Sequence, residues 1–154
     1  LGLRERLGLV DTTHPADRAK QMATASGIAD RLVLTGHRSD VLAAMAAMDV
    51  VTACFRFAAV GRPAFEAMSV GRPVIVNPGH SGKSGAVRHG ETGFVVSPSD
   101  HSGFADAIIR LASDAQLRKT MGDRGRERAR EHFDGRKTIA KIQRIYDEVL
   151  GRLV

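Results

Sequence analysis

Short apolar runs alternate with segments of helical spacing along the middle of the chain. Four of these runs are apolar almost throughout and are bounded by glycine, proline or polar residues, which is typical of buried strands. The four predicted strands cover residues 31–35, 49–54, 73–77 and 92–96. Strands that lack a polar face and are separated by helices indicate a parallel sheet covered on both sides. The predicted fold class is therefore α/β, a Rossmann-like parallel sheet with helices on both faces.

Between and after the strands, apolar residues recur at intervals of three and four, which predicts helices. Ser39 is expected to cap a helix over residues 41–48. Pro63 is expected to open a short helix that Gly71 ends in the left-handed conformation. In the last predicted helix, Ile142 belongs to an apolar stripe that we expect to be buried. The other predicted helices cover residues 1–11, 17–25, 104–111, 114–131 and 136–150.

The length and composition are those of an ordinary globular domain. The 154 residues fit one domain, in which residues 31–100 would form the α/β core and residues 101–154 a helical tail. Apolar residues make up 43% of the sequence and charged residues 26%, which excludes a disordered or collagen-like chain. No apolar run approaches the roughly 18 residues of a membrane-spanning helix, no secretory signal opens the sequence, and the single Cys54 fits a reducing compartment. We therefore expect a cytoplasmic protein.

Positive charge is concentrated toward the carboxyl terminus. The formal net charge is +6, and residues 110–154 hold 12 Lys and Arg against 7 Asp and Glu. Such a basic face suits phosphate, anionic lipid or nucleic acid, and it is equally compatible with a solvated helix surface. Aromatic residues are few and no DNA- or RNA-binding motif accompanies the charge. We therefore expect no nucleic-acid partner, and we leave open a peripheral contact with the inner face of an anionic membrane.

A glycine-rich segment follows the third predicted strand. Residues 78–90 contain four glycines, so main-chain N–H groups there can turn toward a phosphate, with Lys83 as a cation and Ser84 as a hydroxyl donor. Ligands of open parallel sheets bind beyond the carboxyl ends of the strands, which is where this segment lies. We predict a phosphate-binding loop that includes Gly82, Lys83 and Ser84, with a plain glycine-rich turn as the alternative.

The same segment comes within one residue of a P-loop. The first glycine of that motif would have to be Asn77. A P-loop also continues directly into a full helix, whereas Gly85 and Gly90 leave room for about one helical turn before the next strand. A P-loop-type nucleotide binder is therefore the less favoured alternative.

One acidic residue stands out in the apolar helix after the second predicted strand. Glu66 is the only carboxylate between Asp49 and Glu91. A lone acid in apolar surroundings is costly unless it caps a group or binds a polar ligand. A carboxylate accepts two hydrogen bonds, and the two hydroxyls of a ribose offer them in that geometry. The alternative is an exposed helix glutamate without a ligand.

The run from Leu32 to Phe133 resembles the carboxyl-terminal half of the group-1 retaining glycosyltransferases of GT-B architecture. The similarity lies in the order of several short motifs. They are Leu34-Thr-Gly36 with Asp40-Val41, Met48-Asp49-Val50, the stretch from Gly61 through Glu66 to Pro73-Val-Ile-Val, Gly90-Glu-Thr-Gly93, and Met121-Gly122 with Arg130-Glu-His-Phe133. The resemblance implies a nucleotide-sugar-binding domain that forms one half of a GT-B architecture.

The resemblance also implies a reaction. The full enzyme would move a hexosyl group from a nucleoside diphosphate sugar to a sugar or lipid acceptor, with retention of configuration. No metal or other cofactor is expected besides the donor. An amino-terminal acceptor domain, and a loop whose Arg and Lys neutralise the diphosphate, are expected as partners outside this sequence. The fragment alone is therefore expected to be inactive.

Site residues follow from the match of motifs. Glu66 matches the family's glutamate that holds the donor ribose. Gly61, Arg62, Gly36 and His37 are expected around the donor nucleotide, although for His37 taken by itself a solvated loop histidine is the favoured alternative. No residue is assigned a catalytic role.

Two departures from the family bear on the chemistry. The family's other donor-facing glutamate stands eight positions before Glu66, where this sequence has Ala58. The glutamate of the family's phosphate loop is absent as well, because its position is Gly85. These departures keep open a second function, a non-catalytic module that binds a nucleotide or anion.

Overall fold

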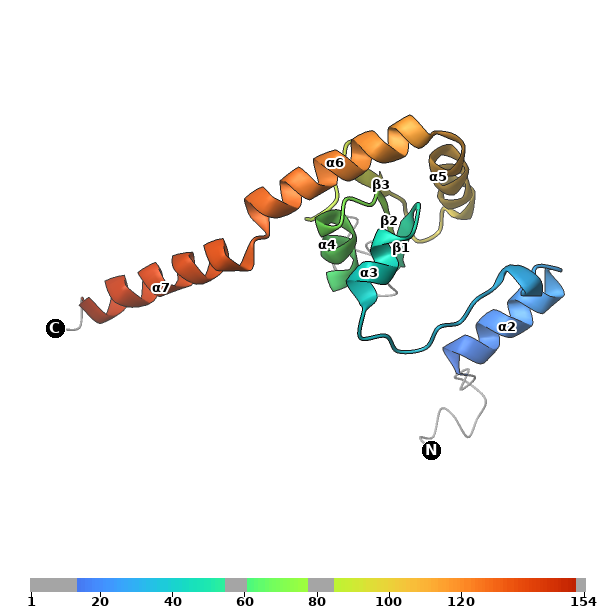
Figure 1. Cartoon of the computed structure of the whole chain (residues 1–154), viewed down its shortest axis with the longest axis horizontal. Coiled ribbons are helices and arrows are strands. Elements are labelled where there is room, and N and C mark those ends of the chain that lie inside the picture. Colours follow the sequence, from blue (N-terminus) through green and yellow to red (C-terminus); the bar gives the residue numbers. More distant parts are fainter. Residues whose placement is uncertain (1–13, 55–60, 78–84, 152–154) are drawn as a thin grey trace. The chain divides into compact units, whose positions relative to one another are not determined.

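The computed structural model describes residues 14–54, 61–77 and 85–151 (Figure 1). The chain divides into two units, Leu1–Ser39 and Asp40–Val154. The predicted helix over residues 1–11 lies outside the described residues. The assignment of all 154 residues to one domain stays a prediction.

The described residues of the first unit, from His14 onward, form one helix and one tight turn. Helix α2 (Pro15–Ala25) is followed by the 3-10 turn η1 (Ala29–Arg31). The first residue of α2 is a proline, which suits that position because its missing N–H would have no partner there. His14 Nδ1 accepts a hydrogen bond from the Ala16 N–H at 3.2 Å, so the helix begins slightly earlier than predicted. Gly27 follows α2 with φ 68°.

The predicted strand over residues 31–35 is wrong. Arg31 ends η1, and no described strand pairs with the residues that follow it. Val33 and Leu34 are 79% and 42% exposed. A strand is held by hydrogen bonds to a neighbouring strand. Residues 32–35 have the composition of a strand, but no described segment pairs with them, and they therefore form no strand.

In the described part of the second unit, three strands form a parallel sheet. The strands are β1 (Val51–Cys54), β2 (Val74–Asn77) and β3 (Gly93–Val95), and they lie in the order β1-β2-β3 (Figure 1). In this register Val74 faces Gly93, where any Cβ atom would overlap the Val74 carbonyl oxygen. These strands confirm the last three predicted ones and place all their carboxyl ends at one edge of the sheet.

Five helices accompany the sheet in the described part of the second unit. They are α3 (Val41–Ala46), α4 (Arg62–Ser69), α5 (His101–Ser113), α6 (Ala115–His132) and α7 (Gly135–Gly151). Asp100 and Asp114 each accept a hydrogen bond at 2.8 Å from a main-chain N–H three residues later, which fixes the starts of α5 and α6. Gly71 follows α4 with φ 73°, as predicted. The predicted cap of α3 is wrong, because Asp40 and not Ser39 directly precedes the first helical residue.

Both faces of the sheet are covered, which confirms the predicted fold class. Successive residues of β2 point to opposite faces. Val74 and Val76 pack in a cluster with Met68 of α4. Ile75 packs in a second cluster with Leu111 of α5. Val74, Ile75 and Val76 are all buried, since helices cover each side.

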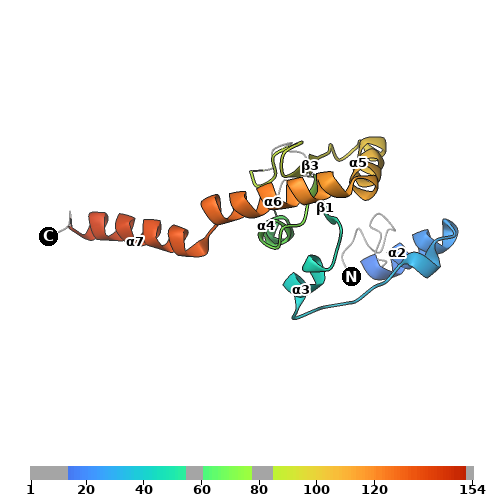
Figure 2. The same ribbon diagram turned by 45° about the horizontal axis from the view of Figure 1, so that its top comes forward.

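Helix α6 packs across α4 (Figures 1 and 2). Near the start of α6, Gly122 lies against the main chain of Gly71, just beyond the end of α4. At the other end, the ring of Phe133 meets the ring of Phe65 edge-on, with centroids 4.6 Å apart. The carboxyl end of α6 therefore lies beside the part of α4 that carries Glu66.

The apolar stripe of α7 is not buried, contrary to our expectation from its spacing. No described residue of α7 falls in the buried class. Ile142 is 47% exposed and Tyr146 is 61% exposed. The helical spacing correctly identified an amphipathic helix, but no described part of the chain covers its apolar face.

Replacing Ile142 with aspartate should therefore leave stability almost unchanged in this chain, with a loss below about 0.5 kcal/mol, as for most exposed positions. The matched control is Leu111→Ala in α5, since Leu111 is fully buried and such a change costs roughly 2–5 kcal/mol. Chemical denaturation followed by circular dichroism compares the two variants. A loss at Ile142 as large as that at Leu111 would mean that the stripe is covered in solution.

Candidate functional site

The carboxyl ends of the strands define the edge at which a ligand is expected. β1 ends at Cys54 and β2 at Asn77. The segments that follow, residues 55–60 and 78–84, lie outside the described residues. Partial burial raises the pKa of the Cys54 thiol, so the protonated thiol prevails at neutral pH. The described chain resumes after these two segments at Gly61 and at Gly85.

Glu66 lies in the second turn of α4. The helix begins after Gly61, and its apolar side is fully buried at Ala64 and Ala67. The Glu66 side chain itself is half-buried. Its main-chain oxygen accepts a hydrogen bond from the Ser69 hydroxyl at 2.7 Å. Within the described ranges, the Glu66 carboxylate has neither a hydrogen bond nor an ion pair, so it is available to a polar ligand.

The Glu66 side chain lines a cavity of about 360 Å³ between α4 and the carboxyl end of α6. Its other lining residues are Leu42, Phe65, Ser69, Ala129, Arg130, Phe133, Asp134 and Arg136. Two carboxylates, two guanidinium groups and two aromatic rings thus line one hollow. Such a lining can accept hydrogen bonds from hydroxyl groups, attract an anion and pack against a flat apolar group.

Asp134 stands between α6 and α7 at the rim of this cavity. The Arg136 N–H donates a hydrogen bond to Asp134 Oδ1 at 2.9 Å, and the Arg136 guanidinium lies 3.3 Å from Oδ2. The main-chain hydrogen bond from Arg136, followed by the side-chain bond, lowers the pKa of Asp134. Because folding lowers the pKa of Asp134, its ionised form stabilises the folded protein. This contribution to stability is fully present above the usual aspartate pKa and is lost as the pH falls through the lowered pKa. Asp134 is therefore ionised at neutral pH.

Gly61 and Arg62, predicted near the donor nucleotide, lie at the start of the helix that carries Glu66. Gly36, with φ 65°, and the exposed His37 belong to the first unit. Of the residues predicted around the nucleotide, the structure therefore places Gly61 and Arg62 at the start of the helix of Glu66, while Gly36 and His37 belong to the other unit. The predicted phosphate contacts Gly82, Lys83 and Ser84, and the departure at Ala58, lie outside the described residues.

Sequence reasoning missed one contact to the end of the glycine-rich segment. Arg128 of α6 donates from Nε to the Ala86 carbonyl oxygen at 2.8 Å and from Nη2 to the Gly85 carbonyl oxygen at 3.0 Å. Its guanidinium also lies 5.5 Å from the centroid of the Phe133 ring. In the sequence, Arg128 is one of many cations in a basic helix, and its separation of more than 40 residues from Gly85 left no local signal.

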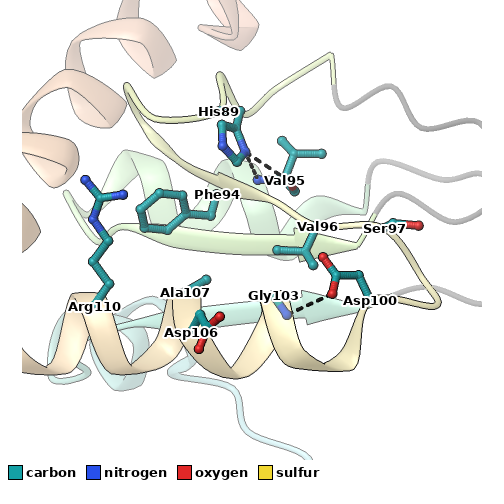
Figure 3. Close-up of a pocket in the computed structure, with 10 residues that line it drawn as sticks. All are labelled: His89, Phe94, Val95, Val96, Ser97, Asp100, Gly103, Asp106, Ala107 and Arg110. Carbon is teal, nitrogen blue, oxygen red and sulfur yellow. Dashed lines mark hydrogen bonds between the residues drawn. The ribbon is translucent and has the colours of Figure 1, made fainter.

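A second hollow, of about 270 Å³, lies between β3 and α5 (Figure 3). The Phe94 ring lies between the His89 ring, 5.6 Å away, and the Arg110 guanidinium, 5.4 Å away. The Val95 N–H lies 3.1 Å from His89 Nδ1, and the Gly90 N–H donates to the Gly93 carbonyl oxygen at 2.8 Å. None of the predicted site residues lines this hollow.

Metal and membrane features were sought in the same ranges. Residues 14–54, 61–77 and 85–151 contain no group of three or more His, Cys, Asp and Glu that could hold a metal ion. Nor is any helix in this part of the chain both long and apolar enough to cross a membrane. The absence of a metal or other cofactor stays a prediction.

The α/β unit has the fold of the GT-B glycosyltransferases. Sucrose-phosphate synthase from Thermosynechococcus elongatus superposes with a TM-score of 0.77 and 27% identity, over 92% of this chain and 37% of that one. HepE from Anabaena, in a complex with UDP-glucose, superposes with a TM-score of 0.74 and 27% identity, over 89% of this chain and 36% of that one.

Sequence comparison identifies the family to which the chain belongs within the GT-B glycosyltransferases. Residues 7–128 match the family described as glycosyl transferases group 1. The N-acetyl-alpha-D-glucosaminyl L-malate synthase of Bacillus anthracis is 32% identical over 123 residues, which cover 80% of this chain and 32% of that protein. The chain belongs to the group 1 glycosyltransferase family. It spans about a third of the length of these relatives.

Proposed function

We propose that this chain is the donor-binding domain of a retaining glycosyltransferase. The full protein would move a hexosyl group from a nucleoside diphosphate sugar to a sugar or lipid acceptor. The observation that carries the proposal is the Glu66 carboxylate, which has no partner among the described residues and lines a cavity of about 360 Å³ between α4 and the carboxyl end of α6. A carboxylate placed in this way can accept both hydroxyl hydrogen bonds of a ribose.

Two further findings support a nucleotide as the ligand. HepE, a neighbour of the same fold, has been solved in complexes with UDP and with UDP-glucose. The glycine-rich segment also begins directly after β2, at the edge where parallel sheets bind their ligands. In the proposed reaction the main-chain amides and cations of this edge would stabilise the charge that develops on the leaving diphosphate.

The direct test is calorimetric titration of the chain with uridine diphosphate and with uridine. We expect saturable binding of the diphosphate and weaker binding of the nucleoside, because the phosphates add charge-assisted hydrogen bonds. If neither ligand binds, the proposal of a donor site in this chain is wrong.

A non-catalytic nucleotide- or anion-binding module is the second candidate function. It is favoured by Ala58, which stands where the family has its other donor-facing glutamate. The two candidates agree on nucleotide binding and differ in whether the full protein turns over a donor. They are separated by assaying the full-length protein with a panel of nucleoside diphosphate sugars.

These 154 residues alone should catalyse no sugar transfer. Transfer needs donor and acceptor held together, because positioning supplies a large part of the rate. The chain spans about a third of its relatives, so we propose that the acceptor wall comes from another part of the protein. The measurement is nucleotide release from a panel of nucleoside diphosphate sugars. Turnover that disappears in Glu66→Ala would contradict this expectation.

A further inference from the structure

We propose that helix α7 lies on the surface of an anionic lipid bilayer, with its apolar stripe inserted among the lipids. The stripe consists of Ile139, Ile142, Ile145, Tyr146, Val149 and Leu150. None of these six residues lines the cavity of Glu66. The inference therefore does not rest on the proposed nucleotide-binding function.

The apolar stripe of α7 is a continuous surface that needs a partner. Each of its six side chains is between 47% and 67% exposed. At about 3.6 residues per turn, the six positions fall within roughly 140° of the helix circumference, and no charged residue falls inside this sector. Single exposed apolar residues are ordinary, whereas a contiguous apolar face marks an interaction surface.

Positive charge accompanies the stripe along the first part of the helix. Residues 135–146 contain four Lys and Arg and no Asp or Glu. By helical position, Lys141 borders one side of the stripe and Arg136 borders the other. Long cationic side chains at such borders cover apolar surface with their methylene groups and keep the charge at the polar boundary. Lys141 and Arg144 form no ion pair or hydrogen bond with any described residue.

The two acids of α7 do not interrupt this arrangement. Asp147 and Glu148 follow the basic part of the helix and lie outside the apolar sector. Four cations and two acids leave the helix with a net charge of +2. The surface that α7 presents is therefore apolar at its centre and cationic at its borders.

An anionic bilayer matches both properties of this surface. Its hydrocarbon takes up the apolar side chains, and its headgroups attract the cations beside them. A helix with one apolar and one charged face lies in the plane of the interface. A second copy of the chain fits less well, because pairing two α7 helices would bring together two sets of four cations on chains of net charge +6.

Tyr146 provides a signal that comes from this helix alone. It is the only tyrosine in the sequence, which contains no tryptophan, so the intrinsic fluorescence reports on the stripe. We expect vesicles that mix phosphatidylcholine with phosphatidylglycerol to protect Tyr146 from quenching by acrylamide. Vesicles of phosphatidylcholine alone should protect it far less. Added salt should weaken the protection, because it screens the attraction to the headgroups.

Two pairs of matched variants test whether α7 makes the contact. Ile142→Asp should lower the affinity for the mixed vesicles about tenfold or more in a co-sedimentation assay, because it removes an inserted side chain and adds negative charge. Ile109→Asp makes the same change in α5, at a side chain that is 62% exposed, and should keep the wild-type affinity. Lys141→Gln should lower the affinity about fivefold, whereas Lys119→Gln in α6 should not. Circular dichroism checks the fold of each variant.

Four results would overturn the inference. Equal binding to both kinds of vesicle, or no protection of Tyr146, would exclude an anionic bilayer as the partner of the stripe. Equal losses in Ile142→Asp and Ile109→Asp would place the contact elsewhere on the chain. A dimer in sedimentation equilibrium that Ile142→Asp abolishes would show that a second copy covers the stripe. If the chain binds the mixed vesicles and the full-length protein does not, another part of that protein covers it.

Discussion

Replacing Glu66 with alanine should weaken the binding of uridine diphosphate about ten- to hundredfold. The physical reason is the loss of hydrogen bonds to a charged acceptor, which contribute roughly 1.5–3 kcal/mol. Because Glu66 has no described partner, its removal should not disturb the protein itself. Isothermal calorimetry gives the affinity, and circular dichroism checks the fold.

Glu91→Ala is the control for a simple loss of negative charge. Glu91 forms an ion pair with Arg88 at 3.4 Å, with both side chains more than half exposed, and it does not line the cavity of Glu66. We expect wild-type affinity in this variant. An unchanged affinity in Glu66→Ala, with the fold intact, would remove Glu66 from the nucleotide site.

Replacing Gly122 with alanine should destabilise the second unit by about 2 kcal/mol. A Cβ atom at this position would overlap the carbonyl oxygen of Gly71, which is main chain and cannot rotate away. Overpacking of this kind costs roughly 1–3 kcal/mol or more, and the gain from replacing a helical glycine with alanine, about 1 kcal/mol, offsets only part of it. Urea denaturation gives the free energy of unfolding.

Gly125→Ala, one turn further along the same helix, is the matched control. Its Cβ would lie 3.5 Å from Met68 Cγ, which is an ordinary packing distance. The alanine should therefore be neutral or stabilise the helix slightly. If the two variants unfold at the same urea concentration, the close approach of α6 to the turn after α4 does not exist in solution.

The parallel core was predictable because its signals are local. β2 is apolar at each of its first three positions, and Gly71 is a glycine at a position with φ 73°. Residues 31–35 have the same kind of composition, yet they form no strand. An apolar composition indicates that a segment can be buried. A strand also needs a neighbouring strand to which it can form hydrogen bonds, and the composition of the segment does not reveal whether one exists.

The candidate site was predictable to a smaller extent. Glu66 could be singled out because it is an isolated acid in an apolar helix, and an isolated charge is visible in a sequence. Phe133 could not be assigned to the site, because it meets Phe65 only after α6 has packed against α4. Contacts between residues so far apart along the chain depend on the register of two helices, which single-residue patterns do not specify.

The described sheet ends at β3, and main-chain groups on the outer edge of this strand already have hydrogen-bond partners within the chain. An exposed strand edge normally presents free N–H and carbonyl groups on which another chain can add as a further strand. Here the Val95 N–H lies 3.1 Å from His89 Nδ1, and the Gly93 carbonyl accepts the Gly90 N–H at 2.8 Å. The turn before β3 thus folds back over the strand. This edge is consequently protected against intermolecular β-sheet growth, without a proline or a lysine in β3 itself.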